Sequence, residues 1–289
     1  MDRHTIIFTT DKRQKHLGEL LLGNRELCSF PEYERRTKLQ EENIEKIYVL
    51  PTPVSKLEQN ESINEKIKEM LKRERAKEYI KVFGGAFTRE WKTFLVENKI
   101  NYIDFMEQKE VVEGNAEITA ESVVAELLQV SPISLEGQQV VITGFGRCAK
   151  CIAKKMTALG ANVLILARSE SARKDAFEMG YQAYDFSYGA YLAMQTNTLI
   201  NTVPSLVVTK EILEKLPKDA IVLDIASKPG GVDFFVAKQL GIYAKLSLGL
   251  PGIYTTKSSA MLLKKAISEY APVNEDRNGG RLWIFQIII

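Results

Sequence analysis

Three small residues follow a short apolar run near the middle of the chain and open a stretch of helical character. At such a turn, the first glycine permits a tight bend and the second lets the backbone approach a pyrophosphate. The third small residue lets the helix pack closely on the strand. A second apolar run follows at 162–166, as a nucleotide-binding strand–helix–strand unit requires. The spacing therefore predicts a dinucleotide site with Gly144, Gly146 and Ala149 as its small residues, and Gly144, Phe145, Gly146, Arg147 and Cys148 as cofactor contacts at a positive helix end.

The residues after the second apolar run indicate which dinucleotide is bound. Enzymes that use NAD carry Asp or Glu there, whereas this chain carries Arg168 and Ser169. An arginine and a hydroxyl suit the extra 2′-phosphate of NADP, and Arg173 and Lys174 could add positive charge one turn later. The sequence predicts NADP, with the alternative that Arg168 is a solvated residue at a strand end.

Two further strand ends carry polar residues that could reach the cofactor. The strand predicted at 198–201 ends in Asn-Thr-Val-Pro, and the strand predicted at 220–225 contains an aspartate. That aspartate, Asp224, could orient the nicotinamide amide, or it could anchor the Ser-Lys-Pro-Gly-Gly turn that follows it. The additional cofactor contacts predicted here are Asn201, Thr202, Val203, Pro204 and Asp224.

Several phrases of the sequence resemble one family. They are Asn201-Thr-Val-Pro204, Asp224-Ile-Ala-Ser-Lys-Pro-Gly-Gly231 with Asp233, Gly249-Leu-Pro-Gly252 followed by Lys257-Ser-Ser, and Ala167-Arg-Ser169. Together with the glycine turn, these resemble the dipicolinate synthase A-subunit family of spore-forming bacteria, strongly over 135–270. Upstream, the looser likeness includes Asp11-Lys-Arg-Gln14 and Asn115-Ala-Glu-Ile-Thr-Ala-Glu121. This chain has Ile118 where the family usually has Pro and Ser122 where it has Gly.

The resemblance implies an NADP-dependent oxidoreductase that acts on a CH–CH group. Its reaction would oxidise a dihydrodipicolinate-level intermediate to dipicolinate (pyridine-2,6-dicarboxylate) in sporulation, beside the flavoprotein-like B-subunit of dipicolinate synthase. The implied fold is that of formate and 2-hydroxyacid dehydrogenase relatives, with two α/β domains around a cleft. Three alternatives stay open: a non-catalytic NADP-binding scaffold, a regulatory subunit of a heteromeric synthase, and a different NADP-dependent dehydrogenase. A homodimer is also left open.

A cyclic dicarboxylate substrate needs fixed cations near the nicotinamide, and three loop cations qualify: Arg13, Lys228 and Lys257. For each, the alternative is a solvated loop residue. Thr119 and Glu121 are weaker candidates, with a cap or hinge role as the alternative. The catalytic base stays unassigned, because His4 and His16 are the chain's two histidines and each is expected at the surface or in packing. Since 2-hydroxyacid dehydrogenases use a histidine base, this shortage argues against a hydroxyacid substrate.

The elements that must position these residues alternate between strand and helix. Strands are expected at 5–9, 47–50, 79–83 and 101–105, and again at 139–143, 162–166, 198–201, 220–225 and 242–246. Such alternation predicts an α/β fold with two doubly wound parallel-sheet domains, the second a Rossmann domain. A helix at 118–130, with Asn115 or Thr119 as its start signal, is expected to link them. The apolar tail 281–289 is left open as an added edge strand, a partner contact or an atypical terminus.

The expected boundaries follow from this alternation. We expect an N-terminal flavodoxin-like domain over 1–117 and an interdomain helix over 118–133. An NADP-binding domain over 134–255 follows, and a C-terminal helix and tail over 256–289 would pack back toward the first domain.

The composition excludes several classes of protein. With 45% hydrophobic and 26% charged residues among 289, the chain is typical of a globular protein of two domains. Its 39 basic and 37 acidic residues leave a net charge of +2, so bulk charge predicts neither a nucleic-acid nor a membrane partner. No signal peptide or membrane span is expected, and the protein is predicted to be cytoplasmic.

Cysteine usage also fits a reducing compartment. The three cysteines are Cys28, Cys148 and Cys151. The Cys-Ala-Lys-Cys motif could bind metal or hold a reactive thiol, but no second pair or nearby histidine completes a site, so packing is expected and no metal is predicted.

Overall fold

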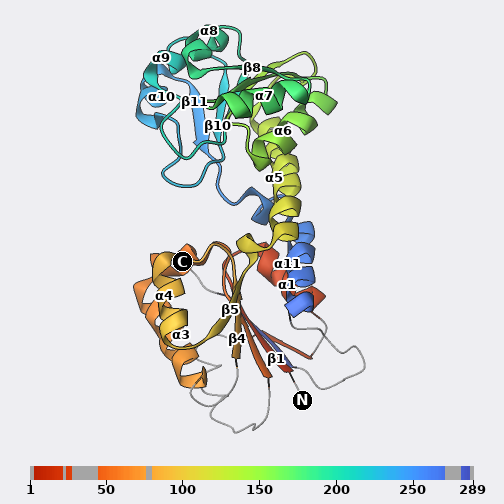
Figure 1. The fold of residues 1–289 in the computed structure, drawn as a ribbon, viewed down its shortest axis with the longest axis vertical. Coiled ribbons are helices and arrows are strands. Elements are labelled where there is room, and N and C mark those ends of the chain that lie inside the picture. The colour runs from red at the N-terminus through yellow and green to blue at the C-terminus, as the bar shows by residue number, and fades with distance from the viewer. Residues whose placement is uncertain (1–2, 22–23, 28–44, 76–79, 271–280, 287–289) are drawn as a thin grey trace. The chain divides into compact units, whose positions relative to one another are not determined.

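A computed structural model describes residues 3–21, 24–27, 45–75, 80–270 and 281–286. The chain forms two compact units. Unit 1 comprises Met1–Asn115 and Thr255–Ile289, and unit 2 comprises Ala116–Tyr254. Each unit is built on its own parallel sheet (Figure 1).

Unit 1 contains a six-stranded sheet in the order β2-β12-β1-β3-β4-β5, whose strand pairs are all parallel. The strand order reverses between β1 and β3, because β2 lies on one side of β1 and β3 on the other. The strands are β1 (Arg3–Thr9), β2 (Asn24–Leu27), β3 (Glu45–Val49), β4 (Ile80–Gly84), β5 (Asn101–Asp104) and β12 (Arg281–Gln286). The helices are α1 (Lys12–Leu20), η1 (Val54–Gln59), α3 (Glu61–Arg75), α4 (Arg89–Glu97), η2 (Phe105–Glu107) and α11 (Thr256–Tyr270).

Helices cover both faces of this sheet. One core contains residues of α3 and α4 packed against Ile6, Phe8 and Tyr48. The other contains residues of α1 and α11 packed against Ile7 and Val49. Neighbouring residues of one strand thus enter opposite cores, as the alternation of side chains along a strand requires. The unit is doubly wound.

The helix α5 (Lys109–Val130) begins earlier than predicted. The prediction of a start at Asn115 or Thr119 is wrong, because both residues lie inside the helix. Gly114 looks like a helix breaker in the sequence, but a Cβ there would lie 2.7 Å from Leu262 of α11. Close helix packing therefore explains the glycine and outweighs its low helix propensity.

Unit 2 contains a six-stranded parallel sheet in the order β11-β10-β9-β6-β7-β8. This is the strand order of the Rossmann fold, with the reversal between β6 and β9. The strands are β6 (Gln139–Thr143), β7 (Asn162–Leu166), β8 (Gln182–Tyr184), β9 (Thr198–Asn201), β10 (Ile221–Asp224) and β11 (Tyr243–Leu246). The helices besides α5 are α6 (Arg147–Ala158), α7 (Glu170–Glu178), η3 (Phe186–Tyr188), α8 (Gly189–Ala193), α9 (Lys210–Leu213), α10 (Phe234–Leu240) and η4 (Leu250–Gly252).

Two apolar cores enclose this second sheet as well. Residues of α5, α6 and α7 pack with Val140 and Ile142 on one face. Residues of α8, α9 and α10 pack with Val141 and Val222 on the other. The predicted fold class, α/β with two doubly wound parallel sheets and a Rossmann-like dinucleotide-binding domain, is confirmed.

The apolar C-terminal segment is an interior strand. Residues 281–286 form β12, which pairs in parallel with β1 on one side and β2 on the other. The suggestion of an added edge strand is therefore wrong, while Cys28 and residues 287–289 lie outside the described residues. Among the helices that the structure describes, none is both long enough and apolar enough to span a membrane.

Candidate functional site

The turn after β6 requires a glycine at its first position. Gly144 has a φ of +81°, in the left-handed region that favours glycine, and its N–H donates to the carbonyl of Leu166 at 2.7 Å. A Cβ at this position would lie 2.8 Å from Thr202 Oγ1 and 2.9 Å from Val203 Cγ2. The backbone conformation and the nearby loop after β9 therefore both exclude a side chain.

Gly146 has a different role, because the space beside it is open. It is the N-cap of α6 with an ordinary φ of −79°, and a Cβ there would meet no described atom within 4 Å. Within the described structure no side chain caps α6, whereas Ser169 caps α7. The first-turn N–H groups of α6 are thus left for an anion, at the positive end of the helix dipole. The arrangement fits a pyrophosphate, whose space a larger residue 146 would reduce.

The remaining residues of the turn divide between core and surface. Ala149 is fully buried against the sheet, and Phe145 is buried with its ring edge-on to Tyr181. Arg147 is exposed at the first position of α6, and Cys148 is half-buried behind it. Of these side chains, Arg147 is the exposed cation at the N-terminus of α6.

At the end of β7, Arg168 and Ser169 are both exposed. Ser169 accepts the N–H of Ala172 at 3.2 Å and so caps α7. Arg173 faces back toward the sheet, because it donates to the carbonyls of Ala167 and Arg168 and pairs with Asp185 at 3.3 Å. Arg173 therefore fixes this loop, and Arg168 is the residue whose charge is presented to solvent.

A cavity of about 380 Å³ adjoins Arg168. Its lining includes two carboxylates, Asp185 and Glu211. The backbone N–H of Ser187 and the charge of Arg173 hold the pKa of Asp185 below its ordinary value, and a hydrogen bond from Thr209 does the same for Glu211. The complete lining is Arg168, Asp185, Phe186, Ser187, Ala190, Leu206, Val207, Thr209, Glu211 and Ile212. The cavity therefore combines a cation at its edge with hydrogen-bond acceptors and apolar walls.

A buried polar network joins the ends of β6, β9 and β10. Thr143 Oγ1 donates to Asn201 Oδ1 at 2.5 Å, and Asn201 Nδ2 donates to Asp224 Oδ1 at 2.7 Å. The N–H of Val203 also donates to Asn201 Oδ1, and Thr202 Oγ1 donates to the carbonyl of Thr143. This network shapes the loop 201–204, which lies directly across the strand reversal from the glycine turn.

Asp224 anchors the turn that follows it. Its carboxylate accepts the N–H of Ala226 at 3.0 Å and that of Gly231 at 2.7 Å, and its side chain is fully buried. Gly230 has a φ of +86°, and a Cβ there would lie 2.6 Å from Asp224 Oδ2. Of the two roles open to this aspartate, these contacts support the anchoring role, so Asp224 shapes the loop beside the cofactor site.

The CxxC motif shows no feature of a reactive pair. Burial raises the pKa of Cys148, and burial together with Glu117 raises the pKa of Cys151 to about 11. Cys151 Sγ donates to Glu117 Oε1 at 3.4 Å. Both thiols are therefore protonated at neutral pH, and no cluster of three or more metal-binding side chains exists among the described residues.

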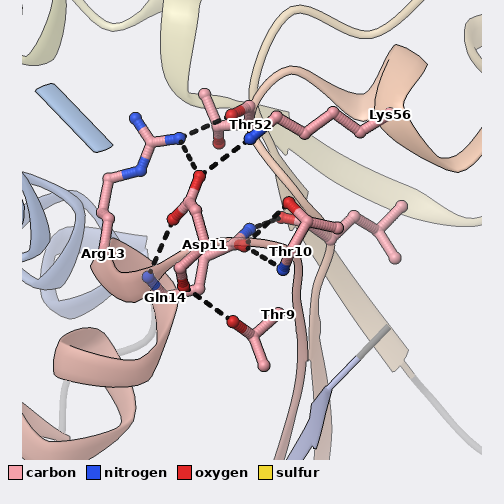
Figure 2. A network of polar contacts seen from close by, with 8 residues as sticks. Thr9, Thr10, Asp11, Arg13, Gln14, Thr52 and Lys56 are labelled. Carbon is pink, nitrogen blue, oxygen red and sulfur yellow. Dashed lines mark hydrogen bonds and ion pairs between the residues drawn. The ribbon is translucent and has the colours of Figure 1, made fainter. Parts of the chain in front are cut away.

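In unit 1, Arg13 lies at the point where the strand order reverses. Its Nη2 donates to Asp11 Oδ2 at 3.1 Å and to the carbonyl of Thr52 at 2.5 Å (Figure 2). Lys56 Nζ donates to the same Asp11 oxygen at 2.9 Å. Gln14 also joins the loop after β1 to the loop after β3, since its side chain accepts the N–H of Thr10 and donates to the carbonyl of Leu50. Arg13 is thus a buried cation held by both loops of the reversal point.

The other predicted substrate residues are scattered among different elements. Lys228 is exposed in the turn after β10, and Lys257 is exposed in the first turn of α11. On α5, Thr119 is buried, while Glu121 is exposed and pairs with Lys155 of α6 at 3.0 Å. His16 pairs with Glu19 on the surface of α1, and the side chain of His4 lies outside the described residues.

Sequence reasoning missed several residues at both sites. Thr52 lies within a Pro-Thr-Pro segment that indicated only the end of a strand, and Lys56 follows it, although that strand end adjoins the reversal point. Of the cavity residues, Asp185 precedes η3, Thr209 precedes α9 and Glu211 lies in the first turn of α9, and none of them belongs to a recognisable motif. The rule that loops at the carboxyl ends of strands bind ligands could have pointed to Thr52 and Lys56. It applies to Asp185 only once β8 is known, because Asp185 directly follows that strand.

Comparison with a family model identifies the second unit more closely. The model described as "D-isomer specific 2-hydroxyacid dehydrogenase, NAD binding domain" matches residues 105–227. This range contains the glycine turn, Arg168 and Asp224. The chain therefore contains a nicotinamide-dinucleotide-binding domain of that class.

A characterised relative covers more of the chain. The dipicolinate synthase A-subunit of Bacillus subtilis (strain 168) is 30% identical over 188 residues, which are 65% of this chain and 63% of that protein. Over these residues the chain is similar to that dipicolinate synthase A-subunit, and its fold is that of the solved A-subunits. The match spans less than two thirds of the relative's length. The relative's name, as the A-subunit of a synthase, implies that it has a partner subunit.

Solved structures of the family share the fold. The crystal structure of the dipicolinate synthase A-subunit from Bacillus halodurans aligns with a TM-score of 0.74 at 24% identity, covering 93% of this chain and 97% of that one. The transhydrogenase from Sinorhizobium meliloti aligns with a TM-score of 0.61 at 11% identity, covering 93% of each chain. At such identities the likeness concerns the fold.

Proposed function

We propose that this relative of the dipicolinate synthase A-subunits is an NADP-dependent oxidoreductase. Its reaction would convert a dihydrodipicolinate-level intermediate into dipicolinate. The observation that carries the proposal is the open glycine turn at Gly146 within a chain 30% identical to one component of a dipicolinate synthase. The turn supports dinucleotide binding, and the relationship supports the substrate.

Arg168 supports NADP as the dinucleotide. It stands at the end of β7, where the ribose of a bound dinucleotide is recognised, and its charge faces solvent. The adjoining cavity would hold the adenine ring between apolar side chains, with Asp185 and Glu211 as acceptors for its amino group. Gly144, Phe145, Gly146, Arg147 and Cys148 would then surround the pyrophosphate, and the loop 201–204 would border the nicotinamide.

The proposed reaction requires little acid–base catalysis from the protein's own side chains. When bound, NADP accepts a hydride from one ring carbon of the substrate, while a proton leaves the neighbouring ring atom, so that the ring becomes aromatic. The aromatic product supplies much of the driving force, and a strongly tuned base is not required. The chain's own residues would bind and orient the reactants, and Arg13, Lys228 and Lys257 are the candidates for holding carboxylates.

A partner protein is part of the proposal. Because the relative is named as the A-subunit of a synthase, we extend to this chain a B-subunit partner. That this partner is flavoprotein-like, and that the chain acts in sporulation, are the expectations of the family resemblance, which we keep as part of the proposal. A cytoplasmic location stays a prediction. The same naming favours a second candidate function, in which this chain binds NADP as a scaffold or regulatory subunit without transferring hydride.

The test follows hydride transfer and product together. The purified chain, with and without its B-subunit partner, is mixed anaerobically with NADP and freshly generated dihydrodipicolinate. Dipicolinate is followed by terbium luminescence and NADPH by absorbance. We expect equimolar NADPH and dipicolinate, and little of either with the Gly146→Ala variant. Dipicolinate formed without NADPH, with the two electrons passing to an oxidised flavin on the B-subunit, would support the scaffold. No dipicolinate despite NADP binding would indicate a different dehydrogenase substrate.

A further inference from the structure

Two buried polar atoms in unit 1 lack hydrogen-bond partners among the described residues. They are Nε of Arg13 and Oγ1 of Thr52, on side chains of residues that are only 6% and 8% exposed. The two residues are themselves joined, because Arg13 Nη2 donates to the carbonyl of Thr52. Buried polar groups are nearly always paired, so adjacent unpaired groups call for an explanation. A ligand that accepts hydrogen bonds from Arg13 and Thr52 would explain why these groups are unpaired.

The two atoms lie where an α/β sheet binds ligands. Arg13 follows β1 and Thr52 follows β3, the neighbouring strands between which the order reverses. Open α/β sheets bind ligands outside the carboxyl ends of the strands at such a reversal. Gly85, directly after β4, packs against Thr52, since a Cβ there would lie 2.6 Å from Thr52 Oγ1, so the glycine lets the threonine side chain lie at this strand end.

The net charge of the cluster formed by Asp11, Arg13 and Lys56 indicates which kind of anion the site would bind. Although burial alone would raise the pKa of Asp11, the charges of Arg13 and Lys56 hold that pKa below its ordinary value, so Asp11 is ionised at neutral pH. With Arg13 and Lys56 both cationic, the three groups sum to one positive charge. A single carboxylate would neutralise this charge, whereas a phosphate dianion would exceed it.

We propose that Arg13 and Thr52 bind one carboxylate of the substrate, and that Asp11 and Lys56 position Arg13 for this contact. Arg13 would donate to one carboxylate oxygen and Thr52 to the other. In the structure both unpaired atoms are shielded from solvent, so contact requires a change of side-chain rotamer, which for Thr52 is a rotation about one bond. In Figure 2 the second terminal nitrogen of Arg13 faces away from Asp11, outside the network. The identity of the substrate rests on the proposed function, but the carboxylate site does not.

Calorimetric titration of the full-length chain tests the site directly. The probes are pyridine-2-carboxylate, pyridine-2,6-dicarboxylate and inorganic phosphate, each with and without NADP. We expect both pyridine carboxylates to bind at least about ten times more tightly than phosphate. Thr52→Val should weaken them about tenfold, Thr52→Ser should restore most of the affinity, and Arg13→Gln should weaken them more than Thr52→Val does.

The melting temperature separates a binding role from a structural one. Thr52→Val removes an unpaired buried hydroxyl, so it should raise the melting temperature of the protein without ligand. The control is Thr196→Val, because Thr196 is also buried but its hydroxyl donates to the carbonyl of Leu192 at 2.7 Å. This control should lower the melting temperature and leave the carboxylate affinity unchanged.

The positioning role of Asp11 has its own readout. Asp11→Asn leaves the cluster with two positive charges, so it should shift the preference of the site from carboxylate toward phosphate, which mere destabilisation would not do. Equal carboxylate affinity of the wild type and Thr52→Val, or no pyridine carboxylate binding with or without NADP, would overturn the proposal. Binding that depends on Arg13 and Thr52 in a protein without dihydrodipicolinate turnover would keep the site and reject the proposed reaction.

Discussion

The side-chain amide of Asn201 donates a hydrogen bond to Asp224 Oδ1 at 2.7 Å and thereby joins the ends of β9 and β10. Both side chains are fully buried, and the Asp224 carboxylate also accepts the backbone N–H groups of Ala226 and Gly231. One carboxylate therefore holds two loops at the edge of the sheet where the dinucleotide is expected. The buried network fixes the shape of this edge before any cofactor arrives.

Asp224→Asn should destabilise the protein. An amide at this position turns an N–H group toward donors that need an acceptor, so the free energy of unfolding should fall by about 2–3 kcal/mol. Urea unfolding followed by circular dichroism measures the change. The control is Asp219→Asn, an exposed position, which should stay within about 0.5 kcal/mol of the wild type. Equal stability of both variants would show that Asp224 does not anchor the turn.

Two glycines of the same turn should respond differently to alanine. Gly146→Ala should change the free energy of unfolding by less than about 1 kcal/mol, because its φ is ordinary and the space beside it is open. Its affinity for NADP should nevertheless fall at least about tenfold, because the Cβ occupies phosphate space. Gly144→Ala should lower stability, since alanine is strained at a φ of +81°. Thermal melts and NADP titration measure the two effects, and unchanged NADP affinity of Gly146→Ala would contradict the predicted phosphate site.

Arg168 should decide the preference between NADP and NAD. Arg168→Ala removes the charge facing the 2′-phosphate, so NADP affinity should fall by about 1.5–3 kcal/mol while NAD affinity changes little. The control is Lys238→Ala, because Lys238 is also an exposed cation of unit 2 but lies on α10 and not after β7. Fluorescence titration with both dinucleotides measures the ratio. A wild type that prefers NAD would reject the assignment.

A buried carboxylate in unit 2 links stability to pH. Glu126 is 2% exposed, pairs with Lys245 and accepts the hydroxyl of Tyr254 at 2.6 Å. Burial opposes ionisation of Glu126, but Lys245 and Tyr254 hold its pKa below the ordinary value, while the hydrogen bond to Glu126 raises the pKa of Tyr254 to about 12. The Glu126 contribution to stability is therefore present above its unfolded pKa of about 4.3 and is lost as the pH falls through the folded pKa. The Tyr254 contribution is present below about pH 10 and is lost as the pH rises through about 12.

Glu126→Gln should bring the pKa of Tyr254 down toward its ordinary value of about 10. The phenolate absorbance of each protein, corrected by subtracting that of its Tyr254→Phe counterpart, measures this pKa. The stability advantage of the wild type over Glu126→Gln should also shrink below about pH 4. The exposed Glu136→Gln serves as a control that changes neither quantity. A Tyr254 pKa that is unchanged in Glu126→Gln would show that another group causes the shift.

Local sequence patterns predicted most elements of the second unit. The strands β6, β7 and β9 have the predicted bounds, because apolar runs of this length between glycine and polar turns specify buried strands almost unaided. The start of α5 could not be predicted in this way. Gly114 and Asn115 look like a helix boundary until Leu262, from a distant part of the chain, explains the glycine.

The sequence by itself predicted the fold class, the dinucleotide turn and the family resemblance, because these depend on residues that are close together along the chain. Only the tertiary structure decided that β12 lies between β1 and β2, that Asp224 anchors a turn, and that Arg13 meets Thr52. Each of these depends on contacts between segments brought together by the sheet. A one-dimensional pattern records the chemistry of each partner, but the strand order decides which partners meet.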